Sequence, residues 1–237
     1  MELFTAENLV AFLTLSALEI ILGIDNIVFI AIISNRLPVQ QQAKARKVGL
    51  ALAMVTRILL LLSITWVMKL TAPLFAVLGQ EFSGRDLILL AGGLFLIAKS
   101  TFEIHEKTEG TGHGSEGGGK ALSYASAVTQ IAVLDIIFSL DSVITAVGMT
   151  NQVAVMIAAV VAAVLVMMVF AEPISAFVKR HPSVQMLALS FLILIGVFLV
   201  AEGLGKHIDR GYIYFAMAFS LGVELLNLRV RKATQRS

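Results

Sequence analysis

Seven long apolar segments, separated by shorter polar stretches, dominate the pattern of this chain. They cover roughly residues 8–34, 48–70, 86–102, 123–148, 153–172, 184–204 and 211–228. About 20 apolar residues cross the hydrocarbon core of a bilayer, so each segment is close to the required length or exceeds it. None alternates as a strand does, and only helices or closed barrels satisfy their backbone in lipid. The pattern predicts an all-α, polytopic membrane protein with seven transmembrane helices.

The composition supports this prediction. Of the 237 residues, 58% are hydrophobic and 14% are charged, and the mean hydropathy is +0.90. A soluble domain carries about 25% charged residues, so lipid must cover much of this apolar surface. The chain has no cysteine, which excludes disulfides and thiolate metal sites.

The basic residues predict the orientation. On one side of the predicted membrane lie twelve of them: Arg36, Lys44, Arg46, Lys47, Lys107, Lys120, Lys179, Arg180, Arg229, Arg231, Lys232 and Arg236. On the other side lie four: Lys69, Arg85, Lys206 and Arg210. Because cytoplasmic loops carry the excess of Lys and Arg, we expect the N-terminus outside and the C-terminus in the cytoplasm. The basic tail follows the same rule and requires no nucleic acid.

Two halves of the chain resemble each other. EIILGIDNIVFI (19–30) matches DIIFSLDSVITA (135–146) at an offset of 116, and GLFLIAKS (93–100) matches GVFLVAEG (196–203) at an offset of 103. Three spans per half place the halves in opposite orientations, as in many transporters whose sites lie at the midplane. We therefore predict a first repeat (1–102), a Gly-rich cytoplasmic linker (103–122), an inverted second repeat (123–207), and a seventh helix with a basic tail (208–237).

Four acids lie about midway along corresponding spans. They are Glu19 and Asp25 in the first half, and Asp135 and Asp141 in the second. Each costs at least about 2.5 kcal/mol in a bilayer centre, so a cation, a proton or a basic group must compensate it. A hard divalent cation would satisfy several carboxylates at once, and neighbouring Asn26 and Ser142 would add neutral oxygens. Such oxygen ligands suit Mn²⁺, Mg²⁺ or Ca²⁺. The alternative is that the acids form helix-to-helix hydrogen bonds or share protons.

The spacing of the acids adds a structural expectation. Six residues advance an α-helix by about 9 Å and turn it by about 600°, so two acids on a straight helix point about 120° apart. Gly23 and Ser139 lie between the acids of each pair. We expect the helices to bend or break at these residues, which would bring the acids together and expose backbone carbonyls as ligands.

Three further charged residues are candidates for coupling or counter-ion roles. Arg57 lies within the second predicted span and is either a counter-ion to the acids or a structural partner. Lys99 and Glu202 occupy matching positions of the second repeat match. They would form a gating salt bridge, or they extend toward opposite interfaces as two separate amphipathic side chains. In the linker, His105 and His113 offer weak metal binding or belong to a solvated loop.

The two acidic motifs closely resemble the paired motifs of TerC-like integral membrane proteins. The resemblance extends over the chain through QEFSGRDLILLAGGLFLIAKS, FVKRHPSVQMLALSFLILIGVFL and RGYIYFAMAFSLGVELLNL. These stretches are similar to the bacterial seven-span branch of the family, found in the inner membrane. The paired-acid, inverted-repeat plan is also similar to that of LysE-like exporters.

The resemblance implies export of Mn²⁺, with Asp25, Asn26, Asp141 and Ser142 as ligands and Glu19 and Asp135 as the outer acids of the same motifs. A proton-coupled secondary transporter is our first hypothesis. The second is an accessory membrane protein that delivers metal to secreted enzymes or contributes to tellurium-type stress resistance. A membrane hydrolase is disfavoured, because every His lies outside the predicted spans, so we expect no enzyme. A homo-oligomer or a partner membrane protein stays open.

Overall fold

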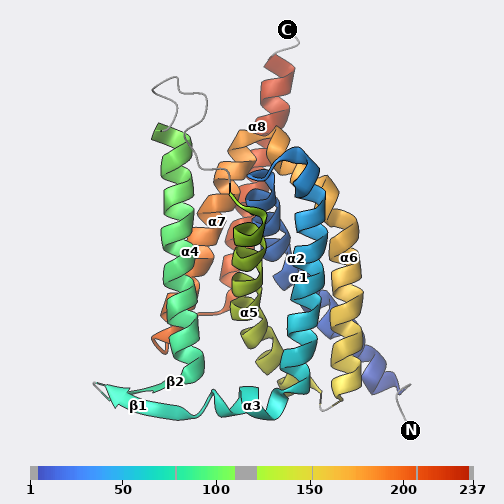
Figure 1. Cartoon of the computed structure of the whole chain (residues 1–237), viewed down its shortest axis with the longest axis vertical. Helices are drawn as coiled ribbons and strands as arrows, with labels where there is room; N and C mark the ends of the chain where they lie inside the picture. Colours follow the sequence, from blue (N-terminus) through green and yellow to red (C-terminus); the bar gives the residue numbers. More distant parts are fainter. Residues whose placement is uncertain (1–4, 78, 110–121, 151, 207, 235–237) are drawn as a thin grey trace. The chain divides into compact units, whose positions relative to one another are not determined.

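The computed structural model describes residues 5–77, 79–109, 122–150, 152–206 and 208–234, without the side chains of Asp25, Asp141 and residues 232–234. Long helices dominate this part of the chain (Figure 1). The elements are α1 (Ala6–Asn35), α2 (Val39–Leu62), α3 (Ile64–Lys69), β1 (Pro73–Val77), β2 (Gln80–Ser83), α4 (Gly84–Glu109), α5 (Tyr124–Met149), α6 (Val153–Arg180), α7 (Pro182–Gly203) and α8 (Arg210–Thr234).

Local sequence signals explain where several helices begin. The Thr5 hydroxyl accepts a hydrogen bond from the Asn8 amide (3.2 Å) and caps α1. The Ser123 hydroxyl accepts one from the Ser126 amide (3.2 Å) and caps α5. Each cap satisfies one of the amides that a first turn leaves without an intrahelical partner. Pro182 opens α7, where its missing N–H and fixed φ suit the first turn.

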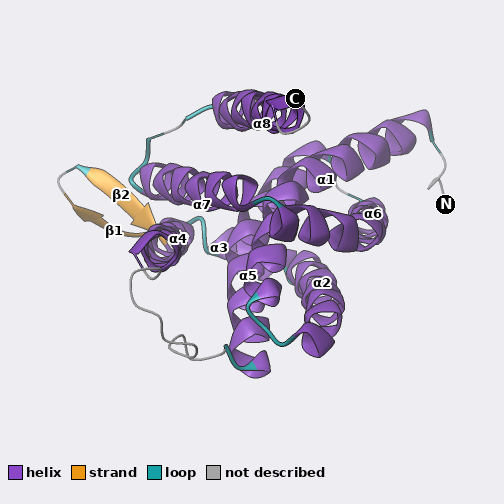
Figure 2. Cartoon of the chain, turned by 90° about the horizontal axis from the view of Figure 1, so that it is seen from above, coloured by secondary structure: helices purple, strands orange, loops and turns teal. Residues whose placement is uncertain are grey.

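The described residues group into two compact units. Unit 1 combines residues 1–85 with 117–177 and so contains α1, α2, α3, the hairpin, α5 and most of α6. Within it α2 packs on α5, and α1 packs on both; Figure 2 shows these helices beside one another. Unit 2 combines 86–116 with 178–237, hence α4, α7 and α8. Each unit therefore contains corresponding helices from both predicted repeats.

In unit 2, α4 and α7 approach closely at two glycines. A Cβ added to Gly93 would lie 2.6 Å from the Gly196 carbonyl oxygen, and one added to Gly196 would lie 2.8 Å from the Gly93 carbonyl oxygen. Both distances are far below van der Waals contact, so only glycine fits at this crossing. Small residues permit such approach in membrane helices, where packing rather than hydrophobic burial holds helices together. The second repeat match thus marks a helix crossing.

Six of the described helices are long and apolar enough to cross a membrane: α1, α4, α5, α6, α7 and α8. Apart from one short hairpin, the described chain is all-α, so the prediction of an all-α polytopic membrane protein is confirmed. Helix α2 is not among the six. Its first half is polar, and it starts at Val39, nine residues before the predicted 48–70 span. Arg57 adds a further charge near its other end.

Two parts of the fold differ from the sequence-based expectation. Helix α4 continues to Glu109, so the start of the predicted 103–122 linker is helical, supported by (i, i+4) ion pairs of Lys99 with Glu103 (2.9 Å) and His105 with Glu109 (3.3 Å). The rest of that linker, 110–121 with His113, lies outside the described residues. The antiparallel hairpin β1–β2 was not predicted. Gly79 there has a φ of 81°, a left-handed turn conformation that glycine adopts without strain.

Candidate functional site

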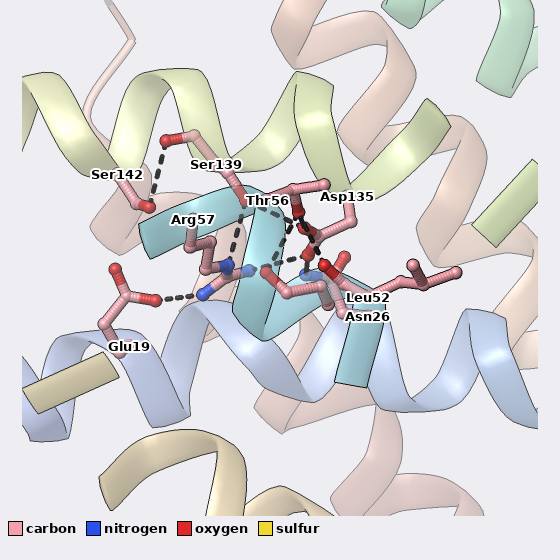
Figure 3. A network of polar contacts seen from close by, with 9 residues as sticks. Glu19, Asn26, Leu52, Thr56, Arg57, Asp135, Ser139 and Ser142 are labelled. Atoms are coloured by element: carbon pink, nitrogen blue, oxygen red, sulfur yellow. Dashed lines mark hydrogen bonds and ion pairs between the residues drawn. The ribbon is translucent and has the colours of Figure 1, made fainter. Parts of the chain in front are cut away.

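The centre of unit 1 contains a buried arginine between two buried acids. Arg57 of α2 is 1% exposed, Glu19 of α1 is 5% exposed and Asp135 of α5 is 3% exposed. The Arg57 guanidinium donates through Nη1 to Glu19 and through Nη2 to Asp135 Oδ1 (3.2 Å), and Nε donates to Ser139 Oγ (2.9 Å). Figure 3 shows Arg57 between the two acids. One cation therefore joins α1, α2 and α5.

Asp135 accepts hydrogen bonds from three further side chains. The hydroxyls of Thr56 and Ser139 donate to Oδ2 at 2.9 and 3.1 Å. The Asn26 amide donates to Oδ1 at 3.4 Å. With the bond from Arg57, these hydrogen bonds fill most of the acceptor sites of the Asp135 carboxylate. Among the described residues, Asp135 has more hydrogen-bond partners than Glu19.

Glu19 has a different environment. Within the described residues Arg57 is its hydrogen-bonding partner. Its side chain also lines a small pocket, whose other lining residues are apolar: Leu15, Leu61, Val143, Ala146, Met156, Ala159 and Val160. A carboxylate with a single partner that borders free space can accept a new ligand more readily than one whose sites are filled. Of the two buried acids, Glu19 is thus the one with fewer hydrogen-bond partners among the described residues and the one beside the pocket.

The contacts also establish how α1 and α5 run. Asn26 meets Asp135, whereas Glu19, seven residues earlier, shares its pocket with Val143 and Ala146, later on α5. Advancing along α1 therefore means going backwards along α5, so the two helices are antiparallel. The two acidic motifs therefore run past each other in opposite directions within unit 1.

Comparison with known proteins places the chain in a family. The sequence profile of the "Integral membrane protein TerC family" matches residues 4–237. This chain belongs to the TerC family. A "UPF0053 protein" of Haemophilus influenzae is 58% identical over 226 residues, 95% of each chain. The "UPF0053 inner membrane protein YgdQ" of Escherichia coli K12 is 58% identical over 215 residues, covering 91% of this chain and 90% of YgdQ. No solved structure matches.

The family assignment and the apolar helices together make this a multi-pass inner-membrane protein of the TerC family. A longer relative contains the same region: the "UPF0053 inner membrane protein YoaE" of Escherichia coli K12 is 53% identical over 220 residues, which are 93% of this chain and 42% of YoaE. The TerC region can therefore form part of a larger protein.

The expected breaks at Gly23 and Ser139 are absent from this TerC protein. Helix α1 is continuous from Ala6 to Asn35 and α5 from Tyr124 to Met149. Gly23 instead allows close packing, because a Cβ there would lie 2.3 Å from the Met167 sulfur of α6. Ser139 donates to Asp135 one turn before it and accepts from Arg57. Gly23 thus serves helix packing and Ser139 hydrogen bonding. The prediction of a break is wrong, and that of a bend stays a prediction.

The structure brings together Glu19, Asp135, Asn26 and Arg57 from the predicted set. Ser142 is buried beside them on α5 and donates to the Ser139 carbonyl oxygen (3.3 Å). Asp25 and Asp141 lie within α1 and α5, but their side chains are outside the described residues. Among the side chains that the structure describes, no three His, Asp or Glu groups converge as a ready ion cage.

Lys99 and Glu202 lie in unit 2. Lys99 pairs with Glu103 on its own helix. Glu202 is buried at the end of α7, where a Cβ at neighbouring Gly203 would lie 2.8 Å from the Asp86 carbonyl oxygen of α4. Lys99 follows Asp86 by 13 residues, which is about 20 Å along the helix. The two charges thus lie about 20 Å apart along the α4–α7 pair, and their part in coupling stays a prediction.

Thr56 and the bonding role of Ser139 were not anticipated from the sequence. Both could have been found: Thr56 directly precedes Arg57, which the sequence predicts inside a span, and Ser139 follows Asp135 by four residues, the spacing that places two side chains on one helix face. A charge inside a span needs polar neighbours, and hydroxyls at these spacings can hydrogen-bond to it.

Proposed function

We propose that this protein is a secondary transporter that exports Mn²⁺ through the site formed by the two acidic motifs. The proposal rests on Arg57, Glu19 and Asp135, which we call the Arg57 cluster. In it, two carboxylates from antiparallel helices are buried around one guanidinium. One guanidinium balances the charge of only one of the two carboxylates. Glu19 and Asp135 with Arg57 leave a formal charge of −1, and Asp25 and Asp141 make it −3. The excess negative charge favours a cation.

The ligand chemistry supports a hard or borderline divalent ion. The described polar groups around Arg57 offer carboxylate, amide and hydroxyl oxygens, from Glu19, Asp135, Asn26, Thr56 and Ser139. Oxygen sets of this type suit Mg²⁺, Ca²⁺ and Mn²⁺. The resemblance of the acidic motifs to TerC-like proteins favours manganese among the three. The ion is cargo, and Asp25, Asn26, Asp141 and Ser142 are its proposed ligands.

Arg57 has a definite part in this proposal. Without cargo, its guanidinium compensates Glu19 and Asp135, which otherwise would be two uncompensated charges in a low-dielectric interior. An arriving divalent cation repels Arg57 and competes for the same oxygens. Glu19, with its single partner and adjoining pocket, is the first to exchange. The Arg57 guanidinium therefore occupies the carboxylates when no cargo is bound. Its return to Glu19 and Asp135 favours release of the cargo.

The same proposal includes the membrane arrangement. Seven spans in an inverted 3+3 repeat plus a final helix require α2 to cross as the seventh, and its charge Arg57 is neutralised internally. The antiparallel course of α1 and α5 supports opposite orientations of the two halves. The excess of basic residues predicts an external N-terminus and a cytoplasmic C-terminus.

Manganese flux in liposomes tests the function. Purified protein with an imposed pH gradient should take up Mn²⁺ faster than protein-free liposomes, and Asp25→Asn or Asp141→Asn should reduce the rate by about tenfold or more, since each removes a charged ligand. Lys47→Met, which changes an exposed residue of α2, is the control. Full transport in both acid variants would refute the assigned ligands. Metal binding without net flux by the wild type would favour the delivery role instead.

A further inference from the structure

A second buried polar cluster joins three helices at the end of unit 1 where α1 ends and α2 begins. Arg46 of α2 is 4% exposed. Its guanidinium pairs through Nη2 with Glu172 of α6, and Nη1 donates to Ser175 Oγ (3.1 Å) and to Ser34 Oγ (3.5 Å). None of these residues belongs to the site around Arg57. We call Ser34, Asn35, Arg46, Glu172 and Ser175 the Arg46 cluster.

The helices α1 and α6 are also bonded to each other directly. The Ser175 hydroxyl donates to Asn35 Oδ1 (3.1 Å), and the Asn35 amide donates to the Ser175 carbonyl oxygen (3.4 Å). Nearby, Gln42 of α2 donates to the Leu37 carbonyl oxygen (2.8 Å) and completes the turn between α1 and α2. This end of the unit is therefore closed by side chains from α1, α2 and α6.

The cluster lies at a weak point of α6. Pro173 is inside the helix, directly after Glu172 and two residues before Ser175. A proline removes one backbone hydrogen bond and crowds the preceding turn, so helices bend at such positions. The Glu172 side chain is 68% exposed, whereas the Arg46 side chain is 5% exposed. Glu172 can therefore leave the ion pair together with α6, while Arg46 stays buried and keeps Ser34 of α1 as a partner.

The opposite end of the unit has a different construction. The pocket beside Glu19 is lined by Leu61 near the end of α2, Ala146 near the end of α5 and Met156 near the start of α6. At the repeat offset of 116, Arg46 corresponds to Ala162 and Glu172 to Thr56. The ion pair therefore has no counterpart in the other half of the repeat. One end has a charged closure, and the other has apolar residues and a pocket.

We propose that the Arg46 cluster is a latch that closes the cytoplasmic side of the transport path. The segment of α6 beyond Pro173 carries Ser175 and moves away from Arg46 when the latch opens. This inference rests on the proposed transport function and on the predicted orientation, in which residues 36–47 face the cytoplasm. The described structure is the latched state, with the Glu19 pocket toward the external side.

Thiol accessibility tests the latch without any transport measurement, because the chain has no cysteine. Ala31→Cys provides the reporter, since Ala31 is fully buried between Asn26 and Ser34 on α1. A membrane-impermeant, charged thiol reagent is applied to the cytoplasmic face of inside-out vesicles. With the latch intact, labelling should be slow. Glu172→Gln or Ser175→Ala should raise its rate about tenfold, as expected for the loss of a hydrogen bond to a charged group.

Two controls keep the result unambiguous. Lys47→Met alters an exposed charge next to Arg46 and should leave the labelling rate unchanged. Glu172→Gln changes an exposed side chain by one atom, so the variant should fold as the wild type does, which gel filtration verifies. Unchanged labelling in both latch variants would overturn the latch, as would acceleration only from the external face. Because the readout is labelling, a functional latch with no Mn²⁺ flux would refute the transport proposal alone.

Discussion

Replacing Arg57 with methionine is expected to destabilise the protein severely. The change leaves Glu19 and Asp135 buried at 5% and 3% exposure without their shared cation. Removal of one partner from a buried ion pair costs about 3–5 kcal/mol, because an uncompensated charge stays in a low-dielectric interior. That is a large part of the total stability of most domains. The melting temperature in detergent, or the amount of monodisperse protein recovered, measures the loss.

Charge neutralisation distinguishes this explanation from lost packing. Adding Glu19→Gln and Asp135→Asn to Arg57→Met removes all three charges and should recover part of the stability, since hydrogen-bonded neutral groups are much cheaper to bury. Lys47→Met removes an exposed charge from the same helix and should change the melting temperature little. An Arg57→Met variant as stable as wild type would show that the guanidinium does not compensate the acids.

Replacing Glu19 with glutamine should abolish manganese export while preserving the fold. The amide oxygen still accepts the hydrogen bond from Arg57, which is the partner of Glu19 among the described residues. The formal charge of the Arg57 cluster rises from −1 to 0, so the attraction for a divalent ion falls. In a deletion strain challenged with Mn²⁺, wild type should lower cellular manganese, and Glu19→Gln should not. Elemental analysis of washed cells gives the readout.

The matched control is Glu81→Gln, which neutralises an exposed acid of β2. It should export as the wild type does. Asp135→Asn would be a poorer test, because Asp135 accepts from Arg57, Thr56, Ser139 and Asn26, and an amide nitrogen would face donors. Equal export by Glu19→Gln and wild type would show that this carboxylate takes no part in transport.

The helices were largely predictable from the sequence, because lipid imposes length and apolarity on each span. The errors have physical causes. Helix α4 continues to Glu109 because Lys99–Glu103 and His105–Glu109 pairs suit a helix outside the apolar segment. The hairpin β1–β2 was not predicted, because PLFAV follows a long apolar run with no polar stretch between them. Its cross-strand Phe75–Phe82 contact, with ring centroids 5.6 Å apart, depends on a register that the apolar pattern does not reveal.

The candidate site was predictable in kind but not in geometry. Acids at an offset of 116 identified α1 and α5 as related helices, and Arg57 was a candidate counter-ion. Its actual pairing joins residues 38 and 78 positions apart, which no local pattern can specify. The role of Gly23 was not predictable, because a glycine in a helix marks either a break or a close contact. The contact here is with Met167, which is remote in sequence.

Binding of Mn²⁺ to the purified protein is the most direct test of the central claim, that the paired acidic motifs form a divalent cation site. The electron paramagnetic resonance signal of free aqueous Mn²⁺ falls as the ion binds. When Mn²⁺ is titrated into the wild-type protein, a saturable amount of the ion should become bound and lose its signal. The Glu19→Gln and Asp141→Asn variants should each bind markedly less Mn²⁺, and Glu81→Gln should bind as much as the wild type. Identical binding by wild type and both site variants, or no saturable binding at all, would contradict the claim.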